Sequence, residues 1–173
     1  MACPYFLPAE RLPWPKWPGK LRPPLGDLYA GVCRAGSEPF LPSGRLLVDC
    51  CNSGYAGAEC NRFSNNDGPD AVRFGLSADD GQTVEIAYAV ERGHLPLRHG
   101  RLRYCRVSKR LTEKEFTQKN SPHVSHPVTG EAVGEKSTFS GFGGFSSDQL
   151  LEGQAQAYLA SYLRSKGEEL VLK

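Results

Sequence analysis

The chain is organised around residues 51–60, which read Cys51-Asn-Ser-Gly-Tyr-Ala-Gly-Ala-Glu-Cys60. Residues 43–52, which lead into this stretch, are predicted to form a short helix, because apolar residues and cysteines recur there at i, i+4 spacing. Gly54 is well suited to end that helix. A cysteine at a helix end, followed by a tight glycine-rich turn that points N–H groups at sulfur, suits a metal site. The stretch therefore predicts that its cysteines bind a metal.

Five of the six cysteines precede Asn61, and four of them are the predicted ligands: Cys3, Cys33, Cys51 and Cys60. They are separated by 29, 17 and 8 residues. Four thiolates are the usual ligand set of an iron–sulfur cluster. The spacing differs from the Cys-x2-Cys pairs of ferredoxins and zinc ribbons, so the prediction rests on composition rather than on a motif. We expect an iron–sulfur cluster of the 4Fe–4S type, with structural zinc, reduced structural cysteines or a disulfide as the alternatives.

The two remaining cysteines are treated differently. Cys50 is the substitute for Cys51, because neighbouring residues on a helix point about 100° apart and cannot both face one ion. Cys51 is preferred because it directly precedes the glycine-rich turn, whereas Cys50 shares a helical face with Leu46. Cys105 lies in a predicted strand, on the face opposite its apolar neighbours, and is expected to take no part in the site.

Length and composition place these cysteines in an ordinary globular chain. A single domain of 173 residues buries roughly two-thirds of its unfolded surface without help from metals or disulfides. The net charge of +2 is too small to indicate nucleic acid or an anionic membrane as a partner. No targeting or membrane-spanning segment is recognised, so we expect a cytoplasmic protein with no membrane partner. Thiols stay reduced in that compartment, which favours metal binding over structural disulfides.

The single domain, residues 1–173, is predicted to have four parts: a proline- and cysteine-rich metal-binding arm (1–63), an antiparallel sheet (70–107), loops (108–145) and a C-terminal helix (146–167). The arm carries nine of the thirteen prolines, so little regular structure is expected there. Its many apolar residues, Trp14 and Trp17 among them, predict that it packs across the sheet.

The fold class is predicted as α+β. Apolar residues alternate with polar or small ones around residues 72–76, 84–90 and 102–104, which is typical of a β-meander with one apolar face. Asp79-Asp80-Gly81 marks a hairpin turn. The C-terminal helix begins with a capping box at residues 146–149 and is expected to cover the apolar face of the meander.

The predicted function is that of a cytoplasmic iron–sulfur cluster-binding protein, whose cluster is structural or exchanges electrons with a redox partner protein. The alternative is a zinc-stapled or metal-free module that binds a protein or nucleic acid through its aromatic arm and its basic strand. That strand lies in a basic stretch containing Arg92, Arg98, Arg101, Arg103, Arg106, Lys109 and Arg110. No complete catalytic constellation is present, so enzymatic activity is left open, as is the oligomeric state.

Overall fold

The computed structural model describes residues 1–13, 22–57, 59–63, 68–113 and 147–171. Within them the predicted α+β class is confirmed: antiparallel sheets pack with one C-terminal helix. Trp14 and Trp17, and the predicted loops from residue 114 to 145, lie outside the described residues. None of the helices in the described ranges is long and apolar enough to cross a membrane.

The larger sheet has four antiparallel strands in the order β3-β4-β5-β6, namely Ala71–Asp79, Thr83–Arg92, Leu95–Cys105 and Arg110–Glu113. The alternating apolar residues predicted the first three strands. The fourth, β6, was not predicted, because four mostly exposed residues carry no clear period-two pattern. It forms because β5 leaves an open edge, along which Leu111 pairs with Tyr104.

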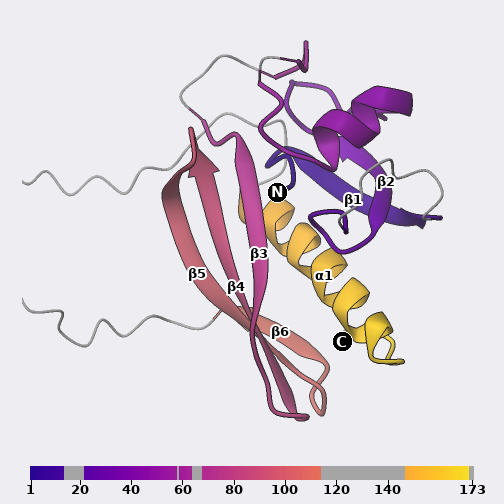
Figure 1. The fold of residues 1–173 in the computed structure, drawn as a ribbon, viewed down its shortest axis with the longest axis vertical. Coiled ribbons are helices and arrows are strands. Elements are labelled where there is room, and N and C mark those ends of the chain that lie inside the picture. Colours follow the sequence, from indigo (N-terminus) through magenta and orange to yellow (C-terminus); the bar gives the residue numbers. More distant parts are fainter. Residues whose placement is uncertain (14–21, 58, 64–67, 114–146, 172–173) are drawn as a thin grey trace, which may run out of the picture.

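The C-terminal helix, α1 (Ser147–Ser165), covers the apolar face of this sheet. Its Tyr158 ring stacks on Phe74 of β3 with 5.7 Å between centroids, and its Leu159 and Leu163 are almost fully buried. The core that results also contains Val72, Val84, Ile86, Tyr88, Leu102, Tyr104, Leu151 and Ala155. Figure 1 shows α1 lying between this sheet and a second, smaller one.

The smaller sheet pairs β1 (Phe6–Leu12) with β2 (Leu28–Cys33) in antiparallel fashion. The expectation that the proline-rich arm contains little regular structure was therefore wrong. Pro8 is tolerated in β1 because the register shifts directly after it, and a proline at a bulge removes no regular ladder bond. The arm does reach the larger sheet, where Ala2 and Val72 exchange two backbone hydrogen bonds of 2.8 Å.

The predicted short helix is confirmed, but most of it, η2 (Leu46–Cys51), is a π-helix. The backbone N–H of Asn52 donates to the Leu47 carbonyl at 3.0 Å, an i→i−5 bond that is one residue wider than in an α-helix. Single π turns of this kind are rare and often lie at functional sites. Here the wide turn ends on the two adjacent cysteines, Cys50 and Cys51.

Candidate metal centre

Backbone pairing brings three of the four predicted ligands together. Cys3 lies in the segment before β1, and its N–H donates to the Cys51 carbonyl at the end of η2 at 3.1 Å. Cys33 ends β2 and pairs in register with Phe6, whose own N–H donates to the Cys3 carbonyl. Segments that are far apart in sequence therefore deliver Cys3, Cys33 and Cys51 to one place.

The fourth predicted ligand joins them through the loop after η2. Cys60 is held by a 2.7 Å hydrogen bond from its N–H to the Ala56 carbonyl, and it is partly exposed. The other three thiols are buried, with exposed fractions of 3–7%. The four predicted residues therefore form a mostly buried group with one edge near solvent.

The thiols of this group influence one another electrostatically. Burial raises the pKa of Cys3 well above its ordinary value, and negative charge on Cys51, Cys33 or Cys60 raises it further. The pKa of Cys51 is raised to about 12 by burial and by charge on Cys33, Cys60 and Cys50. A thiolate here is thus stabilised only if a cation lies among the sulfurs, which is the condition a metal ion or cluster satisfies.

Cys51 and Cys50 occupy different places in this group. Among the cysteines, Cys51 has the largest effect on the pKa of Cys3. Burial raises the pKa of Cys50 as well, and negative charge on Cys60 raises it further. This placement supports Cys51 as the ligand and leaves Cys50 as a fifth thiol at the edge of the group.

Asn52 fixes the end of η2 against β2. Its side chain is 1% exposed, accepts a hydrogen bond from the Tyr29 N–H at 3.1 Å and donates to the Tyr29 carbonyl at 3.0 Å. It also donates to the Leu47 carbonyl at 3.0 Å. The Asn52 amide therefore pairs with the backbone of Tyr29 as a neighbouring strand would. It also bonds a carbonyl inside the π-helix. No sequence pattern indicated this role beyond the position of Asn52 next to Cys51.

Gly54 allows the first residues of the chain to approach the cysteine loop. Its φ is +64°, and a Cβ at this position would lie 2.8 Å from the Ala2 carbonyl oxygen. Sequence reasoning identified Gly54 only as a helix terminator. The structure gives it a second role, since any side chain here would push away the segment that carries Cys3.

Two further interactions hold Cys3. Gln154 of α1 is completely buried, and its Nε2 donates to the carbonyls of Cys3 and Phe6 at 2.7 Å each. The backbone N–H of Tyr5 donates to the Cys3 side chain, which favours the thiolate. This hydrogen bond closes the Cys3-Pro4-Tyr5 turn, in the same way that N–H groups support sulfur ligands in metal sites.

The thiols do not yet form a coordination shell. In the ranges that the structure describes, no three His, Cys, Asp or Glu side chains are placed to hold one metal ion. All six cysteines are free thiols. Cys105 is the last residue of β5, where hydrogen bonds from Ser108 lower its pKa, and the neighbours that set this pKa include no other cysteine. This placement agrees with the expectation that Cys105 takes no part in the site.

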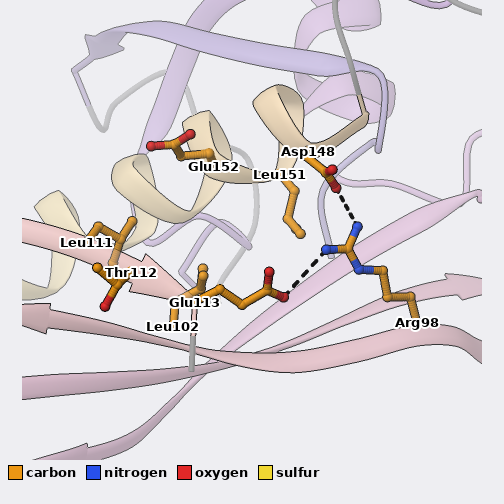
Figure 2. A pocket seen from close by; sticks show the side chains of 8 residues that line it. All are labelled: Arg98, Leu102, Leu111, Thr112, Glu113, Asp148, Leu151 and Glu152. Atoms are coloured by element: carbon orange, nitrogen blue, oxygen red, sulfur yellow. Dashed lines mark hydrogen bonds and ion pairs between the residues drawn. The ribbon is translucent and has the colours of Figure 1, made fainter. Parts of the chain in front are cut away.

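A second candidate site lies between the start of α1 and the strands β5 and β6. It is a cavity of about 240 Å³ with an apolar floor of Leu102, Leu111 and Leu151. Figure 2 shows Arg98 bridging Glu113 and Asp148 at its rim, with N–O distances of 3.4 and 2.5 Å. The guanidinium is thus engaged by two carboxylates.

Three more arginines of the predicted basic stretch, Arg101, Arg103 and Arg106, are also paired. Arg101 and Arg103 both contact Glu85, at 3.8 and 3.1 Å. Arg106 makes two hydrogen bonds with Asp79, of 2.8 and 2.9 Å, and further ones with Glu168. Guanidinium groups engaged in this way are less available to phosphates, so the geometry does not favour the nucleic-acid alternative.

Comparison of the chain with protein-family models, curated proteins and solved structures finds no match. The candidate metal centre is therefore argued from its own geometry and chemistry.

Proposed function

We propose that the protein binds an iron–sulfur cluster, of the 4Fe–4S type, through Cys3, Cys33, Cys51 and Cys60. The observation that carries the proposal is the meeting of these four thiols from separate segments, without a disulfide among them. The donor set fits the cluster, since four thiolates satisfy its iron atoms and the Tyr5 N–H already supports one sulfur. Binding would draw the neighbouring thiols inward.

The cluster would also hold the N-terminal region together. Cys3 precedes β1, Cys33 ends β2 and Cys51 ends η2, so the three residues belong to different segments of the chain. A bound metal centre that links them contributes folding free energy directly. Free thiols at such close range are also expected in a reducing compartment, which supports a cytoplasmic location.

When bound, a 4Fe–4S cluster exchanges single electrons at iron. Cys60 is the one predicted ligand that is partly exposed, so the edge of the site beside it lies nearest to a redox partner protein. Buried Cys3, Cys33 and Cys51 keep water from the opposite side. Structural zinc is the second candidate for the same four thiols, because zinc also accepts four cysteine ligands.

A cysteine series tests the proposal. Each of the four variants Cys3→Ser, Cys33→Ser, Cys51→Ser and Cys60→Ser, purified without oxygen, is expected to lose its iron and acid-labile sulfide. Cys105→Ser is the matched control and is expected to keep the full content, because Cys105 lies apart from the group. Circular dichroism of each variant shows whether α1 and the larger sheet persist. Full metal content in all four ligand variants would rule the proposal out.

A further inference from the structure

The cavity between β5, β6 and the start of α1 has the features of a small-molecule site. Its floor consists of Leu102, Leu111 and Leu151, and its rim carries three carboxylates and one guanidinium. Its volume, about 240 Å³, is below the roughly 300–1,000 Å³ of sites for drug-sized ligands. A molecule that fits this cavity must therefore be small, and part of it must be apolar.

The rim of the cavity carries more negative than positive charge. At one end, the single guanidinium of Arg98 is shared by Glu113 and Asp148, at 3.4 and 2.5 Å. At the other end, the Glu152 carboxylate accepts a hydrogen bond from Gln156 at 3.2 Å, and no basic side chain in the described ranges pairs with it. Each end of the cavity therefore has one negative charge that no basic group compensates.

The Glu113 carboxylate is held in place without any ligand. Tyr88, which is 4% exposed, donates a hydrogen bond to Glu113 Oε1 at 2.5 Å. Tyr88 pairs in register with Gly100, where a Cβ would lie 2.7 Å from the phenol oxygen. Gly100 therefore leaves the space through which the phenol reaches Glu113. A carboxylate that is already positioned loses little conformational freedom when a ligand binds.

The arrangement argues against a metal ion, an anion or a flat aromatic ring as the ligand. A divalent metal ion needs several oxygens around one point, and no three His, Cys, Asp or Glu side chains in the described ranges are placed in this way. Figure 2 shows the Glu152 carboxylate apart from Glu113 and Asp148, which meet at Arg98. An anion would compete with these two carboxylates for Arg98. The described residues that line the cavity include no aromatic side chain on which a ring could stack.

We propose that this cavity binds a short linear aliphatic diamine. One ammonium group pairs with Glu113 and Asp148, the other pairs with Glu152, and the methylene chain lies on the leucine floor. Asp148 and Glu152 are four residues apart in α1, which is about 6 Å along the helix axis and within the span of a short methylene chain. The inference does not depend on the metal centre, because the described residues that line the cavity include no cysteine.

Isothermal titration calorimetry of the full chain with putrescine at low ionic strength tests the inference. We expect saturable binding of one putrescine per chain, which weakens when salt screens the ion pairs. The monoamine n-butylamine has the same chain with a single ammonium group, as a lysine side chain does, and should bind about tenfold more weakly. The inference is overturned if putrescine does not saturate the protein or if n-butylamine binds equally well. Displacement of putrescine by an equal concentration of magnesium chloride or sodium succinate would also overturn it.

Two substitutions show where the diamine binds. Glu152→Gln removes the negative charge at one end of the cavity and should weaken putrescine binding about tenfold. Because Glu152 is exposed, this variant is expected to fold as the unaltered chain does, which circular dichroism checks. Glu169→Gln makes the same change at an exposed position after α1 and should leave the affinity unaltered. Equal weakening in both variants would reveal only a general attraction between charges and would overturn the assigned site.

Discussion

The four-stranded sheet and α1 pack through apolar side chains that alternate along the strands, whereas the N-terminal region, residues 1–63, combines buried apolar side chains with a few buried polar groups and unusual backbone conformations. In the first region, register and period-two patterning bury Val84, Ile86 and Tyr104 almost completely. In the second region, the buried contacts also include the hydrogen bonds of the Asn52 amide, the left-handed backbone of Gly54 and a group of free thiols.

The two regions therefore differ in what stabilises them. An alternating apolar pattern spreads stability over many residues, so single changes have moderate effects. In a region that also relies on a few buried hydrogen bonds and on metal ligands, much of the stability depends on a few residues. Single substitutions there, and loss of the metal, therefore have large effects. We therefore expect residues 1–63 of the metal-free protein to open before the larger sheet does.

The largest expected effect is that of alkaline pH on the metal-free protein. The pKa of Cys51 is raised from 9.0 to about 12 in the folded chain, and that of Tyr5 from 10.0 to about 12. Because both acids are held neutral by burial, their contribution is complete below pH 9 and is lost as the pH rises through about 12. Hydrogen exchange followed by mass spectrometry should show residues 1–63 losing protection first.

Metal binding is expected to depend on pH in the opposite direction at moderate pH. Ligand thiols must lose their protons to bind metal, so metal affinity is expected to rise with pH until the fold opens. Cys51→Ala should flatten the alkaline loss in the metal-free chain, and Cys105→Ala should not, because the pKa of Cys105 is lowered rather than raised. Simultaneous opening of the larger sheet and residues 1–63 would contradict the contrast between the regions.

Asn52→Ala is the next largest effect. The variant leaves the Tyr29 N–H and carbonyl without their side-chain partner inside the protein, together with one bond to Leu47. Buried groups left unsatisfied cost about 1–3 kcal/mol each, so we expect the free energy of unfolding to fall by about 3 kcal/mol. Urea unfolding measures it. Asn61→Ala, at an exposed position, is the control and should change it by less than about 0.5 kcal/mol.

Gly54→Ala should lower the free energy of unfolding by a similar amount, and comparison with a second glycine separates the two causes of this loss. Gly81 also has a positive φ, +82°, but nothing lies within 4 Å of a Cβ placed there. Gly81→Ala should therefore cost about 1–2 kcal/mol, the strain of the left-handed backbone alone. Gly54→Ala adds the 2.8 Å contact with the Ala2 carbonyl and should cost about 1–3 kcal/mol more, with weaker metal binding. Equal costs would show that the Ala2 approach is not important.

The smallest effect is expected at the cavity between β5, β6 and α1. Arg98 is 43% exposed, and its ion pairs with Glu113 and Asp148 lie at the surface. Arg98→Ala should lower the free energy of unfolding by at most about 1 kcal/mol. Arg106, 15% exposed and doubly bonded to Asp79, is the comparison and should cost several times more. A large decrease in the free energy of unfolding for Arg98→Ala would mean that the ion pairs at the rim of this cavity stabilise the fold.

The strands β3, β4 and β5 and the helix α1 could be predicted from the sequence. Most of the structure of residues 1–63 could not. Alternation around residues 72–76, 84–90 and 102–104 is a local property, so three strands and the helix that covers them were foreseen. The pairing of β1 with β2 depends on contacts between distant segments, and the prolines of the arm concealed it. Likewise, Gly54 and Asn52 were visible as residues of a turn, but their partners Ala2 and Tyr29 lie far away in the sequence.

The candidate ligands were predicted from residue type alone, and backbone pairing brings the segments of Cys3, Cys33 and Cys51 together. Neither the spacing nor any single motif specified this meeting, because three separate backbone pairings produce it. The extra thiol, Cys50, was weighed only as a substitute ligand.

The most direct test of the central claim is the visible absorption spectrum of the protein purified without oxygen, with iron and acid-labile sulfide measured on the same sample. The account predicts a brown protein with about four iron atoms and four sulfides per chain. A colourless protein with one zinc ion would make the four cysteines a structural staple. A protein with neither metal would contradict the metal centre altogether.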